Sequence, residues 1–190
     1  MTMNIFHAFN FARAIGVPFN VSVTLHLHET TDQAAATIFE RIRHKYRDWL
    51  SYIARSQGRP FVPMYVYSFE APGNPHVNWV LTIPPELLAA FRAKLPTWIG
   101  KVQGAVDPFD LRVADINPAA YKQMANYIVK GCDPAFARHF FLEVLYAQHG
   151  PQGAFWGKRA GVSPSFNKSA RIAAGYSARQ RQIIASTLAA

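Results

Sequence analysis

The sequence predicts an α+β fold with a mostly antiparallel sheet of about four to five strands and helices packed on it. Strand-like and helix-like patterns alternate along the chain. The second and third strand patterns are joined by too few residues for a parallel crossover, so we expect them to pair antiparallel. The chain has 190 residues, of which 50% are hydrophobic, and this is enough for a single core.

The first half of the chain predicts a strand, a long helix and a hairpin. Strict alternation of apolar and polar side chains indicates a half-buried strand, and apolar residues at helical spacing follow it. Pro63 begins the next strand pattern, and turn-forming residues separate that pattern from a third one. The expected elements are a strand over 20–28, a helix from a cap at Thr31 or Asp32 that the stretch 57–60 ends, and a hairpin of strands 63–69 and 76–83.

The second half predicts three helices and one strand before a basic C-terminal extension. A capping side chain followed by a proline marks the start of a helix at Asn117-Pro118. The expected elements are a helix over 86–94 that Pro96 ends, a strand over 109–114, a helix from 117 to 131, and a helix from Asp133 to about Gln148. A Gly- and Pro-rich stretch then separates a body, residues 1–150, from an extension, residues 151–190, packed on or flanking the same domain.

The charge of the chain is concentrated in that extension. Lys and Arg number 20 against 11 Asp and Glu, which gives a net charge of +9, and no acidic residue follows Glu143. A polyanion such as nucleic acid is the partner that this charge favours, although a solubilising tail, or one that docks on an acidic patch of the same chain, stays open. The expected DNA contacts in the extension are Lys158, Arg159, Lys168 and Arg171. Trp156 either stacks on bases there or fills a core position.

Cysteine content and hydropathy exclude several classes of protein. A single cysteine, Cys132, forms neither an internal disulfide nor a cysteine-based zinc site. No apolar run reaches the roughly 18 residues of a membrane helix, and the first residues lack the pattern of a signal peptide. We therefore expect a soluble protein of the cytoplasm with no membrane partner.

Three polar residues of the predicted hairpin are a candidate metal site. His76 and Asn78 alternate on one strand and so share a face, and Glu70 ends the neighbouring strand. An imidazole, a carboxylate and a carboxamide oxygen suit Mg²⁺ or Mn²⁺. A hydrogen-bonded surface pair is the alternative for the same residues.

The helix after Asn117 carries a candidate nucleophile. Tyr127 shares a helix face with Lys130, whose positive charge would stabilise a phenolate or a phosphate. Tyr121 lies on the apolar face of the same helix, and we expect it in the core. An ordinary amphipathic-helix tyrosine is the alternative reading of Tyr127.

These segments, in this order, resemble the HUH superfamily of single-strand endonucleases, specifically the rolling-circle replication initiators (Rep proteins) of plasmids and phages. The resemblance covers residues 20 to 135 and rests on three short motifs. They are Thr24-Leu25-His26, then Glu70 with His76-Val77-Asn78, then Tyr127-Ile128-Val129-Lys130 with Asp133 beyond. Asn78 stands where the family has the second histidine of His-hydrophobic-His.

The resemblance implies a ferredoxin-like sheet and a nicking and joining reaction on single-stranded DNA. Glu70, His76 and Asn78 would hold Mg²⁺ or Mn²⁺, Tyr127 would attack the scissile phosphate, and Lys130 would assist it. Thr24 and His26 would contact DNA at a replication origin. A host helicase and polymerase would complete replication, because the chain has no ATPase motif. A transposase of the same superfamily and a non-catalytic nucleic-acid-binding module are the alternatives.

A second pair of histidines competes with this metal site. His26 and His28 alternate on the first strand and so form a His-x-His pair. We prefer the hairpin site because the sequence places no acidic residue on a tight hairpin beside His26 and His28.

Overall fold

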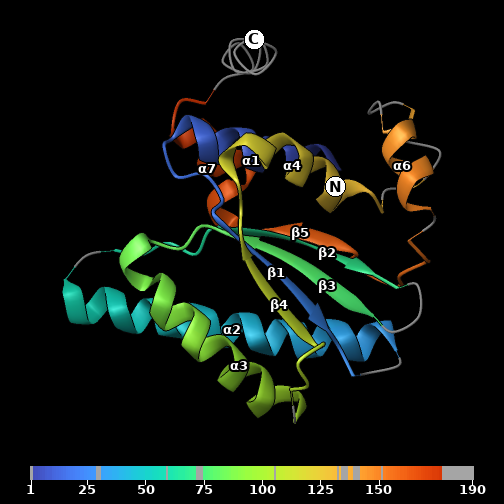
Figure 1. Ribbon diagram of the computed structural model, residues 1–190. Helices are drawn as coiled ribbons and strands as arrows, with labels where there is room; N and C mark the ends of the chain where they lie inside the picture. Colours follow the sequence, from blue (N-terminus) through green and yellow to red (C-terminus); the bar gives the residue numbers. More distant parts are fainter. Residues whose placement is uncertain are drawn as a thin grey trace.

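The computed structural model describes residues 2–28, 31–58, 60–71, 75–104, 106–131, 133, 137–138, 142–150 and 152–176. Its centre is a five-stranded antiparallel sheet in the order β4-β1-β3-β2-β5 (Figure 1). The predicted α+β class with an antiparallel sheet is therefore confirmed. The strands are β1 (Val21–His26), β2 (Tyr65–Glu70), β3 (His76–Leu81), β4 (Leu111–Asp115) and β5 (Ala160–Val162).

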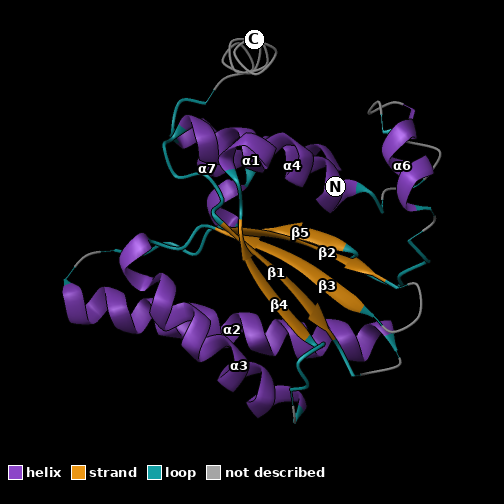
Figure 2. Ribbon diagram, in the orientation of Figure 1, coloured by secondary structure: helices purple, strands orange, loops and turns teal. Residues whose placement is uncertain are grey.

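Helices cover both faces of the sheet, as the colouring by secondary structure shows (Figure 2). One layer is α2 (Asp32–Gln57) and α3 (Leu88–Gln103), and the other is α1 (Thr2–Ala14), α4 (Tyr121–Val129) and α7 (Lys168–Ala173), with α6 (Glu143–His149) beside α4. Short 3₁₀ turns span Pro85–Leu87, Pro118–Ala120 and Pro164–Phe166. No helix in the described part of the chain combines the length and the hydropathy needed to cross a membrane.

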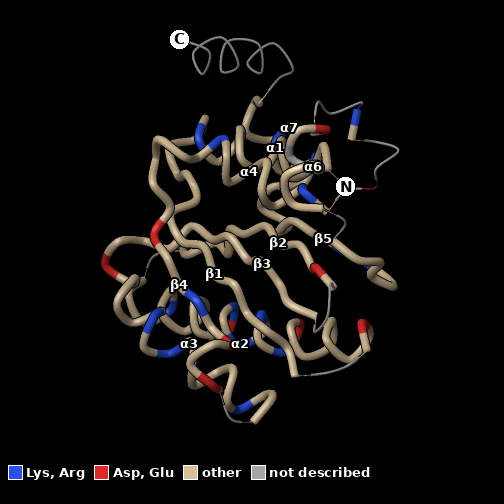
Figure 3. Tube along the Cα trace, turned by 45° about the vertical axis from the view of Figure 1, so that its right-hand side comes forward, with Lys and Arg blue, Asp and Glu red and all other residues tan. Residues whose placement is uncertain are grey.

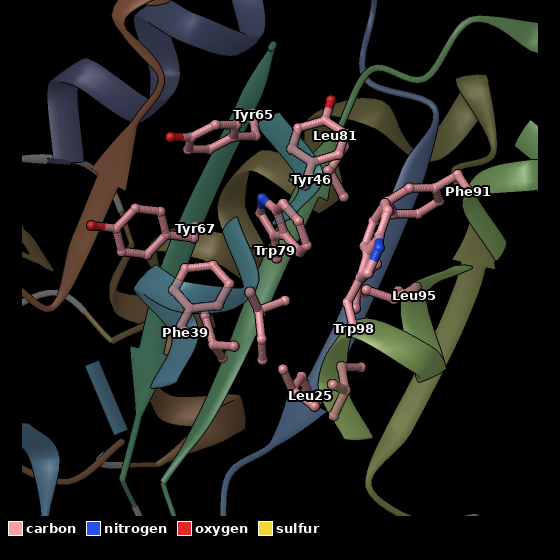
Figure 4. Packing of buried hydrophobic residues seen from close by; sticks show 14 of the residues in the cluster. Leu25, Phe39, Tyr46, Tyr65, Tyr67, Trp79, Leu81, Phe91, Leu95 and Trp98 are labelled. Atoms are coloured by element: carbon pink, nitrogen blue, oxygen red, sulfur yellow. The ribbon is translucent and has the colours of Figure 1, made fainter. Parts of the chain in front are cut away.

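The face toward α2 and α3 is an aromatic core. Trp79 of β3 is fully buried, and its ring lies edge-on to Phe39 at 5.4 Å and to Tyr46 at 5.3 Å (Figure 4). Each strand sends every second side chain to this face, so the strict alternation in the sequence becomes a continuous apolar layer. The same layer takes in Val21, Val23, Leu25, Tyr65, Tyr67, Phe69, Val77 and Leu81.

The face toward α1 and α4 is apolar over only part of its area. Val66 and Val80 pack there with Phe9, Phe19 and Tyr121 in a second core. The remaining positions of β2 and β3 on this face are polar, as are Thr24 and His26 of β1, and all of these lie toward the end of the sheet where β1 and β2 finish and β3 begins.

The expectation that Pro96 ends a helix is wrong, because α3 runs through Pro96 as far as Gln103. A proline inside a helix removes one hydrogen bond and costs about 3 kcal/mol. Trp98 and Ile99 follow it and are buried in the aromatic core, so their packing offsets that cost. The N-terminal helix α1 was not expected from the sequence at all.

Two predicted helix starts agree with the structure. Thr31, rather than Asp32, caps α2 by accepting a hydrogen bond from the N–H of Ala34 at 3.3 Å. Asn117 accepts one from the N–H of Ala119 at 2.9 Å, ahead of the turn that leads into α4. The helix expected from Asp133 is described only in part, and α6 begins at Glu143. Residues 134–136 and 139–141 of that prediction lie outside the described residues.

The described part of the C-terminal extension is built into the domain. β5 pairs with β2 at the edge of the sheet, and Phe166 is fully buried in the second core. Gly161 of β5 is required there, because a Cβ at this position would lie 2.6 Å from the ring of Tyr67. The two remaining arginines of the extension, Arg179 and Arg181, lie outside the described residues.

Candidate active site

Two cross-strand rows of polar residues occupy the partly polar face of the sheet. His76 of β3 is the register partner of both His26 and Glu70. One step along the strands, Asn78 is the partner of both Thr24 and Ser68. Directly opposed residues in a sheet point to the same face, so strand pairing alone gathers the side chains that the sequence singled out.

Glu70 is the centre of this cluster. Its Oε2 accepts a hydrogen bond from His76 Nε2 at 2.9 Å, and its Oε1 accepts one from Asn78 Nδ2 at 2.8 Å. Thr24 in turn donates from its hydroxyl to Asn78 Oδ1 at 3.1 Å. Glu70 and Asn78 are buried, while His76 is partly exposed. The three side chains predicted to act together do lie together.

Lys130 connects this cluster to Tyr127. Its Nζ lies 3.0 Å from Glu70 Oε2 and 3.7 Å from the centre of the Tyr127 ring. Lys130 is only 6% exposed, so its side chain points into the protein. Because α4 packs across the end of β2, the side chain after its last turn turns inward and meets the buried carboxylate.

The two tyrosines of α4 differ as the helix faces predict. Tyr121 is buried; its hydroxyl accepts from the N–H of Phe19 and donates to the carbonyl of Phe9, each at 3.2 Å. Burial raises the pKa of Tyr121 to about 12, against the smaller opposing effect of the Phe19 hydrogen bond. Tyr127 is partly exposed and lies edge-on to His149 at 5.6 Å.

The electrostatics favour a charged Glu70 carboxylate and a neutral His26 imidazole. Burial opposes ionisation of Glu70, but the hydrogen bond from His76 and the charge of Lys130 outweigh burial and hold the pKa of Glu70 below its usual value. The pKa of His26 is lowered by desolvation and by His76, whose ring stacks on it at 5.1 Å. The cluster therefore resists a further positive charge at His26.

The donor set fits a divalent ion, with one adjustment. A carboxylate, an imidazole nitrogen and a carboxamide are ligands that Mg²⁺ and Mn²⁺ accept. Asn78 presents its Nδ2 to Glu70, and its oxygen bonds to Thr24. A half-turn of the amide exchanges these two atoms, and a threonine hydroxyl bonds to either, so Asn78 can offer its oxygen from the same place.

A second acidic cluster lies beside His28. The Nε2 of His28 is 2.7 Å from Asp110 Oδ2, and ligand atoms of His28, Asp107 and Asp110 lie within 4.8 Å of one another. Sequence reasoning found no acidic partner here; it missed Asp110 because β4 comes to lie next to β1 only in the folded sheet. Acidic groups of this kind are common at surfaces without an ion, and we assign the cluster no function.

The predicted DNA-contact residues separate into two groups. Thr24, His26, Lys158 and Lys168 are exposed or partly exposed. Arg159 and Arg171 also bond to the chain itself, and DNA contact through either of them stays a prediction. Arg159 donates to the carbonyls of Phe69, Gln152 and Gly153 at 3.1, 2.7 and 2.7 Å, and Arg171 is buried and donates to the carbonyl of Phe166 at 2.7 Å.

Trp156 is 85% exposed, so its ring does not fill a core position. The neighbouring Phe155 anchors this segment instead, with its ring stacked on Phe69 at 4.5 Å. Figure 3 shows Lys and Arg in both helical layers, so the positive charge is not confined to the extension. Single-strand stacking stays a prediction for Trp156.

No family model matches this chain, and no curated protein matches it significantly.

Proposed function

We propose that this protein nicks and rejoins single-stranded DNA by tyrosine transesterification, as rolling-circle replication initiators of the HUH type do. The observation that carries the proposal is the position of Lys130. Its ammonium contacts both the Glu70 carboxylate and the ring of Tyr127, so two motifs far apart in the sequence share one site.

In the proposed reaction, Tyr127 attacks the scissile phosphorus. A bond forms from its phenolic oxygen to phosphorus, and the bond from phosphorus to the 3′ oxygen breaks. The phenolic proton is released, and the departing oxygen takes up a proton to become a free 3′-OH. Lys130, next to the ring, stabilises the phenolate before attack. The 5′-phosphotyrosyl link keeps the energy of the phosphodiester, so the same steps in reverse join strands.

Glu70, His76 and Asn78 are the residues that would hold Mg²⁺ or Mn²⁺. Such an ion, when bound, supplies Lewis-acid polarisation of the phosphate. Thr24 bonds to the Asn78 amide and holds it in place whichever of its atoms faces Glu70, and His26 lines the site through its stacking on His76. The substrate would be single-stranded DNA at a plasmid or phage replication origin, in the cytoplasm, with host helicase and polymerase as further partners.

A non-catalytic nucleic-acid-binding module is the second candidate, and one observation favours it. The Glu70 carboxylate already bonds to Lys130, His76 and the nitrogen of Asn78, so its charge is balanced without a metal. A transposase of the same superfamily would use the same residues as the replication initiator.

An adduct assay separates the enzyme from the binding module. The protein is incubated with Mn²⁺ and mixed-sequence single-stranded oligonucleotides labelled at either the 5′ or the 3′ end, followed by denaturing electrophoresis. A 5′-phosphotyrosyl enzyme retains the 3′ label and releases the 5′-labelled fragment. Absence of any adduct contradicts the transesterase.

Tyr127→Phe should abolish that adduct, because it removes the attacking oxygen while leaving the ring. Tyr121→Phe is the matched control on the same helix; it should lower thermal stability, since its hydroxyl bridges Phe19 and Phe9, yet retain the adduct. An adduct formed by the Tyr127→Phe protein and lost in the Tyr121→Phe protein would reverse the assignment.

A further inference from the structure

A cleft of about 510 Å³ opens beside Tyr127, between α4 and α6. We propose that it binds one nucleobase of the DNA strand, next to the phosphate that Tyr127 attacks, and that it prefers adenine. This inference rests on the proposed function, since the position of the base is defined relative to Tyr127.

The walls of the cleft have the chemistry that a base requires. Met124 and Leu142 give it an apolar surface, and the rings of Tyr127 and His149 flank it. A base presents a flat π face, which stacks on aromatic side chains whatever its identity. The volume lies within the range of sites that bind small planar ligands.

Three carboxamides line the same cleft, and they are the selective element. Gln123 and Asn126 come from α4, and Gln148 comes from α6. Within the described part of the chain, none of these amides bonds to another residue, so all three have free donors and acceptors. An amide that donates and accepts side by side matches the adenine edge at N6 and N7.

A neighbouring cavity offers a place for a backbone phosphate of the same DNA strand. A space of about 210 Å³ between α1 and α4 is lined by Arg13 and Lys122, and Asn126 lines both this space and the cleft. Arg13 and Lys122 are exposed cations. A strand with a base in the cleft can therefore place a phosphate near them, which favours a nucleic acid over a free nucleobase or an uncharged peptide.

Binding of short oligonucleotides without cleavage tests the proposal. The full chain in EDTA is titrated with fluorescent hexamers of dA, dC and dT, and the affinities are compared. We expect the dA hexamer to bind about tenfold more tightly than the others, at the lower end of what amide readout provides. Equal affinities for the three hexamers, or no binding, would overturn the proposal.

Variants of the cleft residues test which side chains produce the preference for adenine. The double variant Gln123→Ala with Gln148→Ala should bring the three affinities within about twofold of one another, while Gln33→Ala, an exposed glutamine of α2, should preserve the preference. Lys122→Ala should weaken all three equally. A preference that survives the double variant would place the readout elsewhere and contradict the cleft.

This test and the adduct assay fail independently. Because EDTA prevents metal-dependent cleavage, a base preference without an adduct would retain the cleft and reject the transesterase. An adduct with no base preference would retain the transesterase and reject the proposed role of the cleft.

Discussion

The two faces of the sheet use the same strands for different purposes. Toward α2 and α3, the strands present Tyr65, Tyr67, Phe69, Val77, Trp79 and Leu81, all of which are buried in one aromatic core. Toward α1 and α4, the alternate positions of the same two strands are Val66, Ser68, Glu70, His76, Asn78 and Val80. One face is uniformly apolar, and the other changes from apolar to polar along its length.

The difference between the two faces separates the apolar core that stabilises the fold from the polar residues of the candidate site. Buried polar groups cost free energy unless they are bonded, and Glu70 and Asn78 are bonded to each other and to their neighbours. A sheet that needed only stability would carry apolar residues here as well. The polar part of the face toward α1 and α4 is therefore where we propose the chemical role, and neighbouring residues on one strand allow the two faces to be tested separately.

Trp79→Ala should produce the largest loss of stability. The side chain is fully buried and in ring contact with Phe39 and Tyr46. Its removal leaves a cavity, which should lower the free energy of unfolding by about 3 to 5 kcal/mol. Chemical denaturation measures this loss. At a temperature where the variant is folded, we expect adduct formation per folded molecule to be nearly unchanged.

Asn78→Ala is the matched change one residue away on the other face. It removes one hydrogen bond to Glu70 and one from Thr24, so the cost should be about 1 to 3 kcal/mol. Adduct formation should fall much further than in the Trp79→Ala protein. If Trp79→Ala abolished adduct formation in folded protein and Asn78→Ala did not, the division between the faces would be wrong.

Glu70→Gln tests the buried ion pair of the polar face. Lys130 and Glu70 have side chains only 7% and 2% exposed, so removing the carboxylate charge leaves a buried ammonium without its partner. At pH 7 the expected loss is of order 3 kcal/mol. A loss below about 1 kcal/mol would mean that water reaches Lys130 more easily than its burial indicates.

The pH dependence of that loss has a definite sign. The pKa of Glu70 is lowered in the folded state, so its contribution is fully present above the usual carboxyl pKa and is lost as the pH falls through the folded value. The difference in unfolding free energy between wild type and Glu70→Gln should therefore shrink as the pH drops below about 4.5. A difference that grows on acidification would contradict the assignment.

Local patterns predicted much of the fold, and the differences have physical causes. Strict alternation located β1 and β4, because a half-buried strand shows its own period. β2 and β3 are buried on both faces, and Pro63 and the turn residues between the two strands located them instead. Pro96 misled the prediction because the packing of Trp98 and Ile99, which a local rule does not include, keeps α3 intact. β5 is too short to give a pattern and is defined by its pairing with β2.

The candidate site was predictable where strand register alone creates it. Glu70, His76 and Asn78 meet because they are cross-strand neighbours. The inward turn of Lys130 and the closeness of His149 to Tyr127 depend on how helices pack, which spacing does not encode. Net charge also gave no sign of the bonds that Arg159 and Arg171 make to backbone carbonyls, because composition does not distinguish a guanidinium bonded to carbonyls from one in solvent.

Substitution of Gly161 or Gly131 tests the two faces of the sheet near β5. A Cβ at Gly161 would meet the buried ring of Tyr67 at 2.6 Å, and one at Gly131 would meet the Arg159 guanidinium at the same distance. Arg159 is a flexible side chain, but three backbone carbonyls hold it. We expect each Gly→Ala variant to lose about 1 to 3 kcal/mol by denaturation.

Only Gly131→Ala should also reduce adduct formation, because Gly131 follows Lys130 directly and Arg159 bonds to the carbonyl beside Glu70. Equal activity of the two glycine variants, each compared at the same folded fraction, would show that Arg159 has no influence on the position of Lys130.

The smallest expected effect concerns the exposed and buried cations of the C-terminal extension. Lys158 and Lys168 are exposed, so each can neutralise a phosphate, and a contact of this kind contributes about 0.7 to the slope of log affinity against log salt on single strands. Lys158→Ala and Lys168→Ala should each flatten that slope by up to this amount, with no change in sequence preference or stability.

Arg171→Ala is the contrasting change. It should lower the unfolding free energy, because its buried guanidinium bonds to the carbonyl of Phe166, and it should leave the slope of the folded protein unchanged. Titrations of one oligonucleotide at several salt concentrations give the slopes. If Arg171→Ala flattened the slope while both lysine variants left it unchanged, the extension would contact DNA through a surface other than its exposed lysines.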